Sequence, residues 1–162
     1  MKIIYIAGPY RSNTEYGLKR NIDLAEKRAI LVWQSGGAAL CPHKNSAYLG
    51  GVTPDNNFLI GGLELLTRCD AVYVGGDYKN SQGTMAEIAL AKQLGMPVLW
   101  NKDQVELYLN GTMDLECMPT NEDYNQLVDS TKAEDTGTPV VYEDAKEWGF
   151  TQNEELSTIS TL

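Results

Sequence analysis

Apolar and polar positions along the first hundred residues predict strands and helices in turn. The run Lys2–Ala7 (KIIYIA) is short, apolar and ended by Gly8-Pro9, which is typical of a buried parallel strand. Further short apolar runs predict three more strands, at Ala38–Cys41, Ala71–Val74 and Pro97–Trp100.

Longer amphipathic segments separate these strands. Ser12 and Glu15 have the spacing of a capping box and open a helix that runs to about Gln34. Thr53-Pro54 starts a second helix, with Pro at its first helical position, and Met85–Leu94 forms a third. The alternation predicts an α/β protein of the flavodoxin- or Rossmann-like class, with a parallel sheet of four or five strands flanked by helices.

Charge divides the chain near residue 100. Residues 1–100 carry 10 basic and 8 acidic side chains, whereas residues 101–162 carry 3 basic and 14 acidic ones, which together give the net charge of −9. We therefore expect an α/β core at 1–100 and an acidic C-terminal extension at 101–162 that packs on the core or on a partner subunit. Within this extension, helices are expected at 122–128 and 143–148 and a strand at 139–142.

Composition also excludes several classes of protein. No apolar run approaches the roughly 18 residues of a membrane span, and the N-terminus lacks the pattern of a signal peptide. The three cysteines are scattered, which suggests neither a disulfide framework nor a metal site. A basic stripe for a nucleic-acid polymer is missing. We expect a cytoplasmic protein without cofactor, metal or membrane partner.

Residues that can take part in binding or catalysis follow the predicted strands. Ligands bind at this edge of the sheet in parallel α/β folds. The first strand ends in Gly8-Pro9-Tyr10-Arg11, the second is followed by Pro42-His43, and the third by Gly75–Gly83. GPYR has neither the GxGxxG spacing of a dinucleotide fold nor the GK[ST] of a P-loop. A glycine after the first strand is also common in any α/β fold, and His43 by itself is better explained as a polar loop residue than as a catalyst.

The segment NSQGTMAEIALAKQLG places a carboxylate on the apolar side of a helix. Free N–H groups after Ser81 and Gly83 favour an anion such as phosphate, although ordinary capping explains the same residues. Glu87 lies opposite the polar face of this helix. It also follows Thr84 at capping-box spacing, so capping and chemistry are both open interpretations.

Two adjacent glycines, Gly61-Gly62, interrupt the second predicted helix. Each costs about 1 kcal/mol relative to Ala in a helix interior. Such a pair indicates the close approach of a ligand or of another backbone, and close helix–sheet packing is the simpler alternative.

In their order along residues 1–100, these motifs resemble the nucleoside 2-deoxyribosyltransferase superfamily, in particular its small phage and bacterial members and the deoxynucleoside-monophosphate N-glycosidases. The matching motifs are GPYR, LLTRCDA, S-x-G-x-x-x-E and LGxPV. The resemblance implies that Glu87 is a nucleophile toward C1′ of the sugar. It implies that Ser81, Gly83 and Arg11 hold a 5′-phosphate, and that Gly8 and Tyr10 line the base and sugar.

The chain departs from that pattern at Gly62, where the superfamily usually has an aspartate that assists departure of the base. His43 is a candidate proton donor in its place. Two functions follow: cleavage or exchange of the N-glycosidic bond of a nucleotide or nucleoside, or binding of a nucleotide-derived signal without catalysis. In either case we expect a small-molecule ligand and a homo-oligomer.

Overall fold

The computed structural model describes residues 1–113, in which the strands form one parallel sheet of order β2-β1-β3-β4. β1 (Ile3–Ala7) pairs with β2 (Ala38–Leu40) on one side and with β3 (Ala71–Val74) on the other, and β4 (Val98–Leu99) adds to β3. The predicted α/β class is therefore confirmed. The expected fifth strand at 139–142 and the helices at 122–128 and 143–148 lie outside the described residues.

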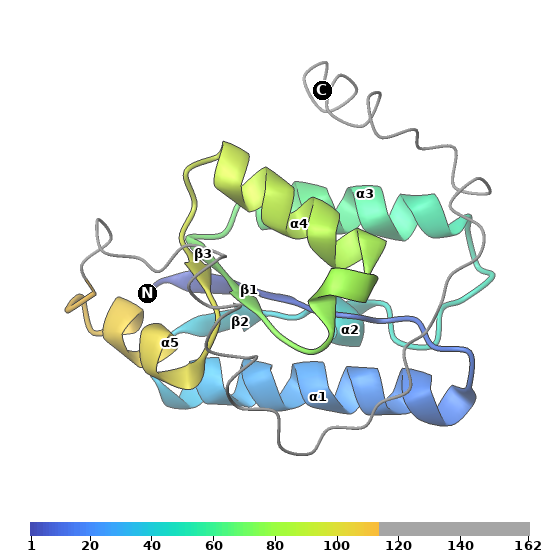
Figure 1. The fold of residues 1–162 in the computed structure, drawn as a ribbon, viewed down its shortest axis with the longest axis horizontal. Coiled ribbons are helices and arrows are strands. Elements are labelled where there is room, and N and C mark those ends of the chain that lie inside the picture. The colour runs from blue at the N-terminus through green and yellow to red at the C-terminus, as the bar shows by residue number, and fades with distance from the viewer. Residues whose placement is uncertain (114–162) are drawn as a thin grey trace.

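Helices cover both faces of the sheet (Figure 1). α3 (Asp55–Leu66) and α4 (Gln82–Gln93) lie on one face, and α1 (Glu15–Gln34) and α5 (Lys102–Leu109) lie on the other. A short helix, α2 (Pro42–Asn45), follows β2, and a 3₁₀ turn, η1 (Tyr78–Asn80), precedes α4. The sheet is thus the middle of three layers.

The central strand is apolar throughout because both of its faces are covered. Ile4 and Ile6 pack into the cluster under α1 and α5, whereas Tyr5 and Ala7 pack into the cluster under α3 and α4. All four are fully buried. The near-continuous apolar run seen in the sequence is what such a strand requires.

The starts of the three predicted helices differ from those observed. Thr14, rather than Ser12, is the N-cap of α1 and accepts a hydrogen bond from the Gly17 N–H. Pro54 is the N-cap of α3 rather than its first helical residue. α4 begins at Gln82, three residues before the predicted start, and Ser81 caps it.

Two helices within residues 1–113 were not predicted. Pro42 starts α2 rather than only ending a strand, since proline is well tolerated at the first helical position. α5 buries Val105 and Tyr108 against the sheet, so the folded unit extends beyond the boundary placed at residue 100.

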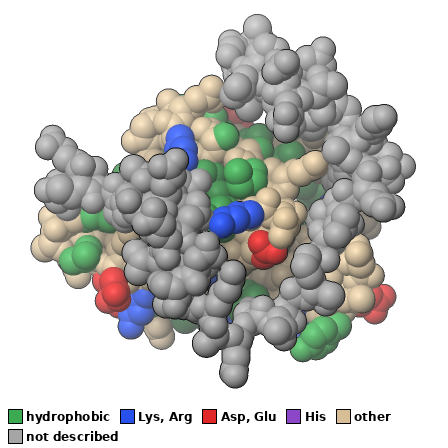
Figure 2. Space-filling view, viewed as in Figure 1, with side chains coloured by type: hydrophobic (Ala, Val, Ile, Leu, Met, Phe, Trp, Pro, Cys, Tyr) green, Lys and Arg blue, Asp and Glu red, His purple; other side chains and the backbone are tan. Residues whose placement is uncertain are grey.

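No helix within residues 1–113 is long and apolar enough to cross a membrane. Figure 2 shows charged side chains of both signs scattered over the visible part of one face, rather than gathered into a basic stripe.

Candidate functional site

A cavity of about 200 Å³ lies at the carboxyl edge of the sheet, between the end of β1 and the helices α2, α3 and α4. The ends of parallel strands meet there, which is why the loops after β1 and β2 can share one wall. Most of the predicted site residues line it: Gly8, Tyr10, Arg11, His43, Gly62, Ser81, Gly83 and Glu87.

Glu87 is the acidic group at the base of this cavity. Its Oε1 accepts a hydrogen bond of 2.6 Å from the hydroxyl of Tyr5 on β1. Burial raises the pKa of Glu87 from 4.5 to about 8, and the hydrogen bond from Tyr5 opposes that rise. Because α4 begins at Gln82, Glu87 lies beyond the first turn and its carboxyl contacts β1 rather than a free helix N–H. The capping interpretation of Glu87 is therefore wrong.

Tyr5 belongs to the site although the sequence did not single it out. It is fully buried in the middle of β1, and burial together with the neighbouring Glu87 raises the pKa of its hydroxyl far above the usual value. A tyrosine in an otherwise aliphatic strand is a usable signal, because a buried hydroxyl needs a partner. The identity of that partner, 82 positions away, could not be read from the strand.

Gly62 lies directly beside this hydrogen bond. A Cβ at position 62 would come within 3.0 Å of the Tyr5 hydroxyl oxygen, whereas a Cβ at Gly61 would meet nothing within 4 Å. Of the two predicted reasons for the pair, close helix–sheet packing accounts for Gly62. No contact among the described residues explains Gly61.

The N-terminus of α4 forms another part of the wall. Ser81 Oγ accepts from the Thr84 N–H at 3.3 Å and from the Thr84 hydroxyl at 2.8 Å. The N–H groups of Gln82 and Gly83 belong to the first turn and have no acceptor within the helix. Together with the helix dipole, they favour an anion at this point of the cavity.

Arg11 and Asp55 form an ion pair at the mouth of the cavity. Arg11 lies in the loop between β1 and α1, and Asp55 is the first residue of α3. Each side chain is 42% exposed, so the pair borders both cavity and solvent. The sequence analysis selected Arg11 but not Asp55.

His43 is buried in α2, and its Nε2 lies 3.1 Å from the Pro9 carbonyl oxygen. Burial lowers the pKa of His43, so the ring is neutral near pH 7 and carries its proton on Nε2. Nδ1 has no hydrogen-bond partner among residues 1–113. The ring packs edge-on against Tyr10, with centroids 5.7 Å apart.

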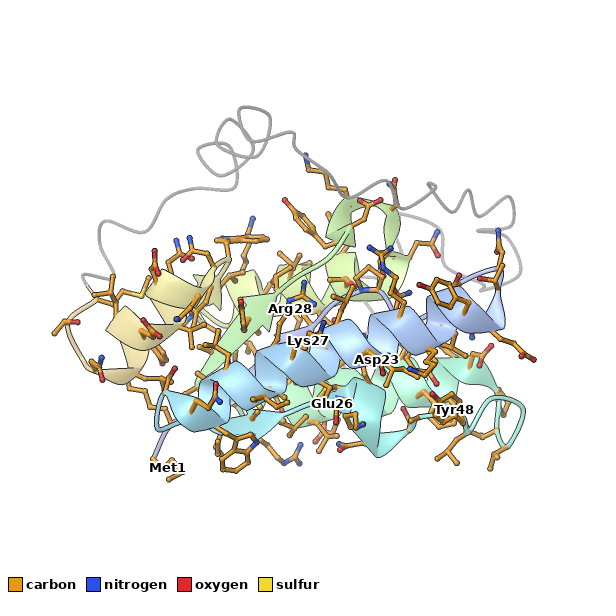
Figure 3. The ribbon with its side chains drawn as sticks, turned by 90° about the horizontal axis from the view of Figure 1, so that it is seen from below. Met1, Asp23, Glu26, Lys27, Arg28 and Tyr48 are labelled. Atoms are coloured by element: carbon orange, nitrogen blue, oxygen red, sulfur yellow. The ribbon has the colours of Figure 1, made fainter. Side chains whose placement is uncertain are left out.

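Two predicted ligand-binding residues, Pro9 and Gly75, do not lie on the cavity wall. Pro9 contributes the carbonyl that His43 contacts. Gly75 directly follows β3, and the side chain of Arg28 from α1 (labelled in Figure 3) fills the space that a Cβ at Gly75 would occupy. Both nevertheless support the site, since the Gly75 carbonyl is so close to Gly8 that a Cβ there would lie 3.0 Å from it.

Within residues 1–113, no group of three or more His, Cys, Asp or Glu side chains could hold a metal ion. The fold and the site define a parallel α/β protein with a cavity at the carboxyl edge of its sheet. A family model matches residues 2–101, and the chain belongs to that family, a domain of unknown function (DUF7768). No curated protein and no solved structure matches the chain significantly.

Proposed function

We propose that the protein binds a nucleotide and cleaves or exchanges its N-glycosidic bond, with Glu87 as the nucleophile. The observation that carries this proposal is the Glu87 carboxyl in the cavity wall, which the Tyr5 hydroxyl holds and whose pKa is raised to about 8. An acid in a cavity with a strongly shifted pKa is a candidate for a functional role.

The reaction would proceed in two displacements. A Glu87 carboxylate oxygen attacks C1′, the bond from C1′ to the base nitrogen breaks, and its electron pair leaves with the base. Water or a second base then attacks C1′ and releases Glu87. Tyr5 would fix the attacking carboxylate in orientation, because its hydroxyl already donates to Glu87 Oε1.

The phosphate of the nucleotide would lie between Arg11 and the start of α4. Both line the cavity, and a guanidinium and free helix N–H groups are the donors that phosphate prefers. We therefore expect the protein to prefer 5′-phosphorylated ligands over nucleosides.

A second function, binding without catalysis, is favoured by the surroundings of Glu87. With a pKa of about 8, most Glu87 carboxyls carry a proton at neutral pH and cannot attack C1′. Gly62 offers no carboxylic acid to protonate the leaving base, and the neutral His43 points its N–H at Pro9. A protein with this cavity would retain an intact nucleotide and could sequester or sense it.

Base release from deoxynucleoside monophosphates separates the two functions. We expect mass spectrometry to detect free base with the wild type and none with Glu87→Gln. Glu64→Gln is the matched control, because Glu64 lies on the exposed side of α3 in an ion pair with Arg68. Retention of an intact nucleotide without base release would discard the enzymatic function in favour of binding.

The pH dependence of base release is a second readout of the same experiment. Attack requires the carboxylate, so the rate should rise about tenfold per pH unit up to a pKa of about 8 and then level off. A rate that is flat between about pH 6 and about pH 8 would contradict a nucleophilic Glu87.

A further inference from the structure

The Arg11–Asp55 ion pair is unusual for an anion site, because the cation at the mouth of the cavity already has a carboxylate partner. Arg11 and Asp55 come from separate segments, and both line the cavity. Glu87, the other acidic residue of the described wall, is mostly protonated at neutral pH. Asp55 is therefore the acidic side chain of the described wall that already engages the cation.

We propose that Asp55 is an internal competitor for Arg11, so that an anion binds at this end of the cavity only by displacing the Asp55 carboxylate from the guanidinium. The inference rests on the nucleotide ligand proposed above. A singly charged group that replaces the Asp55 carboxylate exchanges one anion for a similar one and gains little. A terminal phosphate carries about two negative charges and three acceptor oxygens, so it can contact Arg11 and also reach the α4 N-terminus.

The position of the pair makes the exchange feasible. Both side chains are partly exposed, so Asp55 can turn to solvent when the ligand enters and is not left as a buried, unpaired charge. Exposed ion pairs contribute little stability, so their separation is a small cost that a dianion can offset.

The test compares ligand affinities for the full-length wild type and the Asp55→Asn variant. The probes are a 2′-deoxynucleoside 5′-monophosphate, its 5′-methyl phosphodiester and inorganic phosphate, each measured by calorimetry at neutral pH. The wild type should prefer the monoester. Asp55→Asn should bind both nucleotides more tightly, roughly 2- to 5-fold and by similar factors, because the ion pair that has to be separated is the same for either ligand.

Glu64→Gln is the matched control, since it removes one negative charge from the same helix outside the cavity. Weaker binding by Asp55→Asn would overturn the proposal, because Asp55 would then contact the ligand or hold Arg11 in place for it. Affinities equal to those of Glu64→Gln, or no binding of any probe to either protein, would overturn it as well.

Base release is followed in the same samples and reports on Glu87 separately. If Asp55→Asn tightens binding but neither protein releases base, this inference holds and the enzymatic function is ruled out. If base is released but Asp55→Asn leaves the affinities unchanged, the enzymatic function holds and this inference is ruled out.

Discussion

The protonation state of Glu87 connects the chemistry of the site to the stability of the protein. Burial raises its pKa to about 8 from a value of 4.5 for the exposed group. Between these two pH values, the folded protein binds one proton more than the unfolded chain. Stability contributed by this group is therefore present below about pH 4.5 and is lost as the pH rises toward 8.

We expect the free energy of unfolding of the wild type to fall between about pH 5 and about pH 8, by up to about 1.4 kcal/mol per pH unit. Glu87→Gln should remove most of this decline, because an uncharged amide fills the same place. Denaturant titrations at several pH values measure both slopes. Glu64→Gln should keep the wild-type slope, and an unchanged slope in Glu87→Gln would show that Glu87 ionises normally.

At the scale of single elements, α3 offers a matched pair of positions. Gly61→Ala should stabilise the protein by about 1 kcal/mol and leave the site unchanged, since the new Cβ meets nothing within 4 Å. Gly62→Ala has the same helix propensity gain but places its Cβ 3.0 Å from the Tyr5 hydroxyl. The hydroxyl has to shift by a few tenths of an ångström, which should weaken its hydrogen bond to Glu87 and raise the pKa of Glu87 further.

Denaturant titration and the pH profile of base release, or of nucleotide affinity, distinguish the two variants. Gly61→Ala should have the pH profile of the wild type, whereas Gly62→Ala should shift this profile to higher pH. Identical behaviour of the two variants would show that Gly62 is not needed to seat Tyr5.

The strands could be predicted nearly residue by residue, whereas helix starts could not. Ala71–Val74 matches β3 because a short apolar run between polar residues has few other uses in an α/β chain. Ser12 and Thr14 are both good caps, and only the packed helix shows that Thr14 takes the role. The same ambiguity between Ser81 and Thr84 made Glu87 resemble a capping residue.

The candidate site was predictable as far as it depends on strand ends. That rule selected Gly8, Arg11 and His43, all of which line the cavity. Contacts between side chains that are far apart in the sequence could not be predicted from this rule. Tyr5 meets Glu87, and Asp55 meets Arg11, only because the sheet order brings β1 beside the helices that follow β2 and β3.

At the scale of the whole molecule, the family match ends at residue 101 but the hydrophobic core does not. Val105 and Tyr108 of α5 are buried beneath the sheet, and the Tyr108 hydroxyl donates to the Asp70 carbonyl at 2.9 Å. Full burial of two such side chains is worth about 3–6 kcal/mol as an upper estimate.

A chain truncated after Met113 should therefore unfold cooperatively, and one truncated after Asn101 should lose a large part of its stability. Thermal melts of both truncations against the full chain measure the difference. Equal melting temperatures for the two truncations would mean that α5 contributes nothing to the core.

The cavity wall is built partly from regular secondary structure and partly from a loop. Tyr5 and Glu87 come from a central strand and a long helix, whereas Ser46 and Gly50 come from the loop after α2. In that loop Tyr48 has a positive φ of 61°, and its N–H donates to the Tyr10 hydroxyl. Loops accept insertions and replacements far more readily than buried strands do. Substitutions and insertions in this loop can therefore change which ligands the cavity admits, without disturbing the Glu87 carboxyl and the Tyr5 hydroxyl.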